Sequence, residues 1–98
     1  MDVAREKLVR TLEWLSVELA ASGSLALCLR RLPPQDYQAL CGPRVPASSW
    51  RWSRHLQPGS TAEALALARI ALAAGADQPA RLGARLARLV TDLRGAAP

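Results

Sequence analysis

The sequence contains few of the side chains from which metal sites and active sites are built. Its 98 residues include one His and two Cys, and no CxxC spacing relates Cys28 to Cys41. A structural zinc ion needs four such ligands, so we expect no metal and no cofactor. Catalysis needs a nucleophile, a base and an orienting group within reach of each other. The acids are scattered along the sequence, and they form no recognisable catalytic pattern with His55 or the two thiols. We therefore predict that the protein is not an enzyme and that both thiols are reduced, inert core groups.

The sequence also lacks long apolar runs and phosphate-binding glycine motifs. No stretch approaches the roughly 18 uncharged apolar residues that a membrane span needs. The N-terminus MDVAREKLVR carries acids and has no apolar segment of the kind found in signal peptides. The glycines form neither a P-loop nor a GxGxxG pattern. We expect a cytoplasmic protein that contacts no membrane and binds no nucleotide.

Phenylalanine is absent, β-branched residues are few, and the apolar half of the chain is mostly Ala and Leu. Ala and Leu are among the strongest helix formers, so the composition predicts an all-α fold. A chain of this length can bury a core without help from a metal or a disulfide. We predict one domain over residues 1–95, followed by a frayed tail over residues 96–98.

Helical spacing and end signals divide the chain into six predicted helices. Leucines recur at steps of four, three and four near both ends of the chain, which is one face of an amphipathic helix in each case. Gly23 and Ser24 form a stop and a start, and Ser60 with Glu63 forms a capping box. The predicted helices cover residues 2–21, 25–32, 34–42, 48–56, 61–75 and 78–93. The predicted core includes Leu12, Leu15, Leu19, Leu67, Ile70, Leu86 and Leu89, with Trp14 at its edge. The expected fold is thus a compact six-helix bundle.

A basic surface is the main functional signal, because twelve Arg and one Lys outnumber eight acids and give a net charge of +5. Such a charge suits an acidic partner. In the segment SSWRWSRHL, helical spacing points Trp52 inward and leaves Arg51 and Arg54 outside with Trp50 near them. Trp beside Arg is typical of protein interfaces. The alternative is a small basic nucleic-acid-binding protein, in which Trp50 stacks on an unpaired base and the arginines hold phosphates.

Two stretches resemble the caspase recruitment domain of the death-fold superfamily. LRRLPPQDYQAL is similar to the junction of the second and third helices of that family, and LARIALAAGADQPARLGARL is similar to its passage from the fifth helix to the sixth. The start AREKLVRTLEWLSVEL also resembles the first helix of pyrin domains. The resemblance implies a six-helix death-fold domain that recruits or assembles a protease, sensor or effector in a defence or cell-death pathway by contact between like domains.

The resemblance also implies the residues that bind the partner. In the family a basic surface on the first and fourth helices meets an acidic surface on the second and third. Arg10, Arg51 and Arg54 match the basic side. Asp36 is the only acid in the segment that would supply the acidic side. We therefore expect pairing with a more acidic domain in preference to self-polymerisation.

Overall fold

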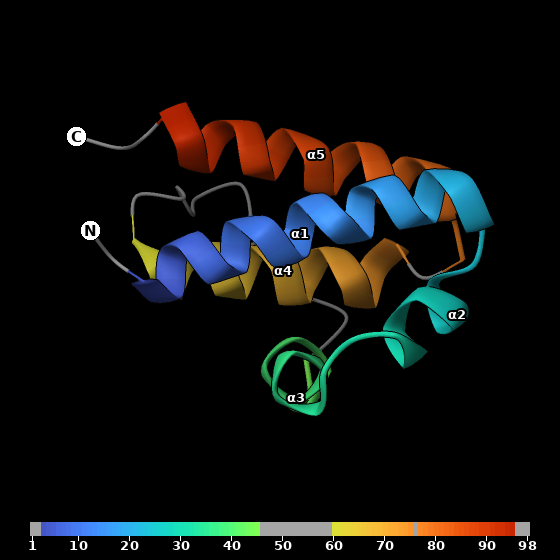
Figure 1. The fold of residues 1–98 in the computed structure, drawn as a ribbon, viewed down its shortest axis with the longest axis horizontal. Coiled ribbons are helices and arrows are strands. Elements are labelled where there is room, and N and C mark those ends of the chain that lie inside the picture. The colour runs from blue at the N-terminus through green and yellow to red at the C-terminus, as the bar shows by residue number, and fades with distance from the viewer. Residues whose placement is uncertain (1–2, 46–59, 76, 96–98) are drawn as a thin grey trace.

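The computed structural model describes residues 3–45, 60–75 and 77–95, which hold five α-helices in place of the six predicted (Figure 1). The predicted helix over residues 48–56, with Trp50, Arg51, Trp52 and Arg54, lies outside the described residues. The rest of the chain has no β-strand where it is described, which confirms the all-α prediction there. The helices are α1 (Val3–Ser22), α2 (Leu25–Arg30), α3 (Pro34–Cys41), α4 (Thr61–Gly75) and α5 (Pro79–Gly95).

Local sequence signals set the ends of these helices close to where they were predicted. Gly23 follows α1 with φ of 68°, and its amide donates to the Leu19 carbonyl oxygen at 2.9 Å. The Ser24 side chain accepts from the Leu27 amide at 3.3 Å and caps α2. Pro34 opens α3, where its missing N–H would have had no helical partner. Glycine therefore stops α1 at the one positive φ in the described chain.

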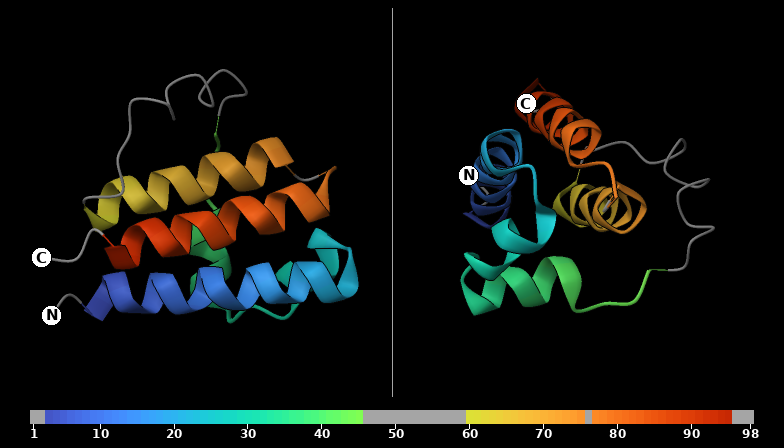
Figure 2. Two further views of the ribbon diagram at one scale, coloured as in Figure 1. Left: turned by 90° about the horizontal axis from the view of Figure 1, so that it is seen from above. Right: turned by 90° about the vertical axis from the view of Figure 1, so that its right-hand side faces the viewer.

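Three long helices form the body of the molecule (Figures 1 and 2). α5 runs antiparallel to α1 and to α4, and the contact between α1 and α5 is the most extensive in the structure. α2 and α3 are short and lie together on one side of this body, away from α5. The radius of gyration is 12.4 Å, close to the value of about 13 Å expected for a compact domain of this length. Of these two short helices, α2 packs against α1 and α3 packs against α4.

Leucine stripes from α1 and α5 supply most of the core. The predicted core residues Leu12, Leu15, Leu19, Leu86 and Leu89 are all buried, and Trp14 is partly buried at the edge as expected.

The prediction for α4 was wrong at Leu67, which is only partly buried. Ala64, Ala68 and Ala71, at steps of four and three, share the inward face of this helix with Leu72. Ile70 is buried but lies outside the main cluster. None of the described helices has the length and apolarity that a membrane span requires.

Candidate protein-interaction surface

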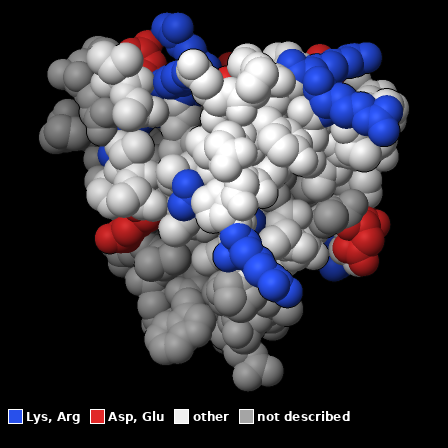
Figure 3. Space-filling model, turned by 90° about the horizontal axis from the view of Figure 1, so that it is seen from below, with Lys and Arg blue, Asp and Glu red and all other residues white. Residues whose placement is uncertain are grey.

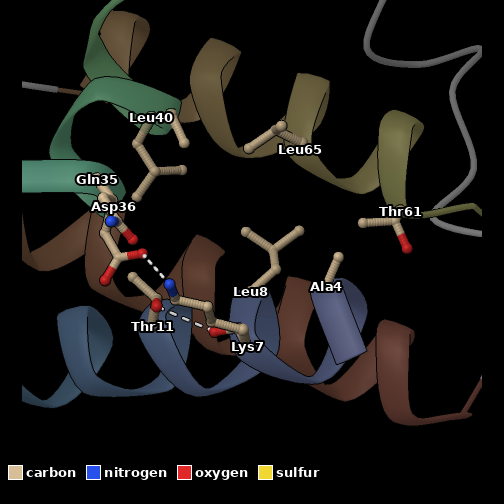
Figure 4. A pocket seen from close by; sticks show the side chains of 10 residues that line it. Ala4, Lys7, Leu8, Thr11, Gln35, Asp36, Leu40, Thr61 and Leu65 are labelled. Carbon is tan, nitrogen blue, oxygen red and sulfur yellow. Dashed lines mark hydrogen bonds and ion pairs between the residues drawn. The ribbon is translucent and has the colours of Figure 1, made fainter. Parts of the chain in front are cut away.

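Asp36 lies in the first turn of α3, where the helix dipole favours a carboxylate. Its side chain is only 17% exposed and pairs with Lys7 of α1, the Nζ to Oδ1 distance being 3.5 Å (Figure 4). This ion pair ties α3 to the outer side of α1. The one acid expected to face a partner is therefore largely used inside the domain.

Arg10 lies one turn further along α1 and is 77% exposed. Its Nη2 donates to the Glu6 Oε1 at 2.8 Å, the i,i+4 pair that the sequence favours. Exposed pairs of this kind contribute about 0–1 kcal/mol, so the guanidinium can exchange Glu6 for another carboxylate at small cost. Arg10 is thus well exposed to a partner, whereas most of the Asp36 side chain is covered.

The structure brings Arg10 and Asp36 to the same hollow, although the family pattern assigns them to opposite binding surfaces. This hollow, called the Trp14 hollow below, has a volume of about 330 Å³ and lies between α1 and the junction of α2 with α3. Its lining residues are Arg10, Thr11, Trp14, Arg31, Leu32, Pro33 and Asp36. Arg31, like Arg10, pairs with a glutamate, and its Nη1 lies 3.0 Å from the Oε2 of the half-buried Glu18. Two guanidinium groups and an aromatic ring therefore line one concave surface.

A second hollow of about 240 Å³ lies beside the first, between α1, α3 and α4 (Figure 4). Leu8, Leu40 and Leu65 come from the three helices and face one another across it, while Lys7 and Asp36 stand at one end. Between the three leucines the hollow offers a surface for an apolar side chain.

Both cysteines are free thiols, and they differ in their burial. Cys28 is fully buried in the core, and its Sγ lies 3.2 Å from the Ser22 Oγ. Cys41 is partly buried at the end of α3, and burial raises the pKa of its thiol. The described part of the chain holds no group of three His, Cys, Asp or Glu side chains that could bind a metal ion.

Most acids of the described residues are already paired with a cation of the same chain. Glu6, Glu18 and Asp36 pair with Arg10, Arg31 and Lys7, and Glu13 of α1 pairs with Arg94 of α5.

Several arginines remain without an ion pair in the described structure: Arg30, Arg44, Arg81, Arg85 and Arg88. Figure 3 shows the side of the molecule on which α2 and α3 lie, where a broad uncharged area is bordered by basic side chains and, at the left and right edges, by acidic ones. Leu27 of α2 and Tyr37 of α3 are 48% and 46% exposed. The uncompensated charge of the described surface is positive, and part of it adjoins exposed apolar groups.

The sequence could not reveal the Trp14 hollow. Arg31 and Pro33 meet Arg10 and Trp14 only because α2 folds back beside α1, and no local pattern reports that contact. The leucine stripe does place Trp14 at the edge of the core, which was the one available signal. Comparisons of this chain with protein-family models, with curated proteins and with solved structures found no match.

Proposed function

We propose that the chain is a non-catalytic protein-interaction domain of the death-fold type, and that it binds an acidic surface of a partner protein. The observation that carries the proposal is the Trp14 hollow, where Arg10 and Arg31 flank an aromatic ring and the apolar Leu32 and Pro33. Trp and Arg are the side chains that most often dominate the binding energy of protein interfaces. An acidic side chain of the partner would enter between the two guanidinium groups.

The charges of the domain favour a partner other than a second copy of this chain. Self-assembly needs a basic surface and an acidic surface on the same molecule. The acids on α1 and α3 are taken up by pairs inside the domain, Asp36 among them. A partner with a surplus of acids could replace Glu6 and Glu18 as the carboxylates that pair with Arg10 and Arg31.

The resemblance to caspase recruitment domains supports the same class of function. LRRLPPQDYQAL, which carries the resemblance, includes Arg31, Leu32, Pro33 and Asp36 of the hollow. In such a role the domain would recruit a protease, sensor or effector that carries a like domain, in a defence or cell-death pathway.

Charge reversal at the hollow tests the proposal. The wild-type chain and the variant Arg10→Glu/Arg31→Glu are immobilised, and bound proteins and nucleic acids from a cell extract of the source organism are identified and quantified. Two repulsive contacts should lower affinity for the identified partner by at least about tenfold. Arg30→Glu/Arg44→Glu is the matched control, because it changes the net charge equally and neither arginine lines the hollow.

Two further readouts separate the possible results. Reversing an acid on the identified partner to Lys should restore binding to the Arg10→Glu/Arg31→Glu variant. The substitutions should cost at most about 1 kcal/mol each in stability, because the arginines are exposed. Single-stranded nucleic acid bound with a steep salt dependence, and no protein partner, would support the nucleic-acid alternative instead.

A further inference from the structure

A row of charged side chains runs along the outer face of α5. Arg81, Arg85, Arg88 and Asp92 follow one another at steps of four, three and four, so they lie on one side of the helix, and all four are exposed. Each residue of this row is followed by a buried leucine, so the stripe of Leu82, Leu86, Leu89 and Leu93 lies about 100° around the helix from the row. We call these four residues the α5 row.

The α5 row has almost no partners within the domain. Arg81 donates to the Gln78 Oε1 at 3.4 Å, and none of the four residues forms an ion pair in the described structure. Like charges one turn apart destabilise a helix, and a cation in its first turn opposes the helix dipole. On α1, by contrast, each glutamate has a cation beside it. The three arginines of the α5 row therefore keep their charge uncompensated by an ion pair in the described structure.

Small side chains lie directly beside the row. Ala80, Ala84, Ala87 and Thr91 each precede a residue of the row by one position, so they repeat the same spacing on the adjoining part of the helix surface, and all four are exposed. Their size lets the axis of another helix approach to the short end of the usual 8–10 Å range. The long arginine side chains would then reach along the flank of that helix.

We propose that this face of α5 binds an amphipathic helix of another protein, with three acids spaced to meet Arg81, Arg85 and Arg88. The sign pattern of the row argues for a protein and against a nucleic acid. A phosphodiester chain is negative throughout and would be repelled by Asp92, whereas a partner helix can place a Lys or Arg there. A second copy of this chain is a poorer match, since its α1 acids are occupied.

This inference goes beyond the proposed function, because it adds a second binding face. α5 lies on the side of the molecule away from α2 and α3, which border the Trp14 hollow (Figure 2). Partners on the two faces would not compete for the same surface. A domain with both faces would join two proteins and act as an adaptor.

The test uses the full chain and synthetic helical peptides labelled for fluorescence anisotropy. One peptide carries Glu at i, i+4 and i+7 and Lys at i+11 on an alanine-rich helix, and a second carries the same row in reverse order to allow antiparallel docking. A third peptide has the same composition with its charges distributed around the helix. We expect one ordered peptide to bind at least tenfold more tightly than the distributed one.

Matched variants then locate the binding face. Arg85→Glu/Arg88→Glu should lower affinity for the ordered peptide at least tenfold, while Arg30→Glu/Arg44→Glu, with the same change in net charge, should lower it less than threefold. Circular dichroism should show that both variants keep the wild-type fold. Arg10→Glu/Arg31→Glu should leave peptide binding unchanged, which separates this inference from the proposed function.

Several results would overturn the inference. Equal affinity for ordered and distributed peptides would do so, as would equal losses in the two arginine variants or no binding of either ordered peptide at 1 mM. A single-stranded 20-mer DNA that binds more tightly than the peptides, and still more tightly to Asp92→Lys, would assign the row to nucleic acid.

Discussion

Leu12 of α1 provides the most direct test of the packing that positions both surfaces. Its side chain is fully buried, at 0% exposure, in the cluster that joins α1 to α4 and α5. Truncation of a fully buried leucine to alanine removes the transfer free energy of the side chain and leaves a cavity, at a cost of about 3–4 kcal/mol. A domain of this size has a stability of about 5–15 kcal/mol. Leu12→Ala should therefore remove a large share of the total.

Val17 supplies the control on the same helix. Its side chain is 61% exposed, so Val17→Ala removes little buried area and introduces a better helix former. Urea unfolding followed by circular dichroism measures both variants. With a slope near 1.5 kcal/mol per molar urea, the midpoint of Leu12→Ala should fall by about 2–3 M, while that of Val17→Ala should hardly move. A loss below about 1 kcal/mol for Leu12→Ala, or equal losses for both, would refute the packing described here.

Two smaller predictions concern the turn after α1 and the thiols. Gly23→Ala should lower the free energy of unfolding by about 1–2 kcal/mol. The reason is backbone strain alone, because φ is 68° and an added Cβ would meet no other atom. Gly95→Ala is the control: its φ is not positive, and in the same urea assay it should cost less than half as much. Cys28 is buried, so a reagent cannot reach its thiol in the native protein. Burial raises the pKa of the Cys41 thiol, so less of the reactive thiolate is present near pH 7.5. Iodoacetamide should therefore label the native protein at least about tenfold more slowly than the urea-unfolded protein. Labelling of either residue at the unfolded rate would show that its thiol is not protected.

The sequence carried enough information to predict the body of the fold. The leucines of α1 and α5 recur at helical spacing, and burial of one face is the only way to remove such stripes from water. Gly23 and Ser24 mark a stop and a start through backbone geometry that depends on neighbouring residues only. These signals are local, so one sequence suffices to find them.

Tertiary contacts decided the features that the sequence did not predict. Leu67 and the alanines of α4 are all apolar, so the composition of that helix does not reveal which face turns inward. Close packing against α5 leaves little room at this face, since a Cβ added at Gly75 would lie 3.2 Å from the Leu82 side chain. The pair between Lys7 and Asp36 joins residues far apart in the chain, and nothing in either local sequence predicts it.

The distribution of ion pairs links the fold to the proposed binding. Glu6, Glu13 and Glu18 of α1 reach cations on three different elements, namely α1 itself, α5 and the end of α2. The acids of α1 thus neutralise neighbouring cations. Among the described residues, arginines without an ion pair remain exposed on α2 and α5. Exposed charges of one sign attract a partner over about one Debye length, some 8–10 Å in physiological salt. Binding at both faces should consequently weaken as salt is raised, while the leucine core that holds the faces apart is unaffected.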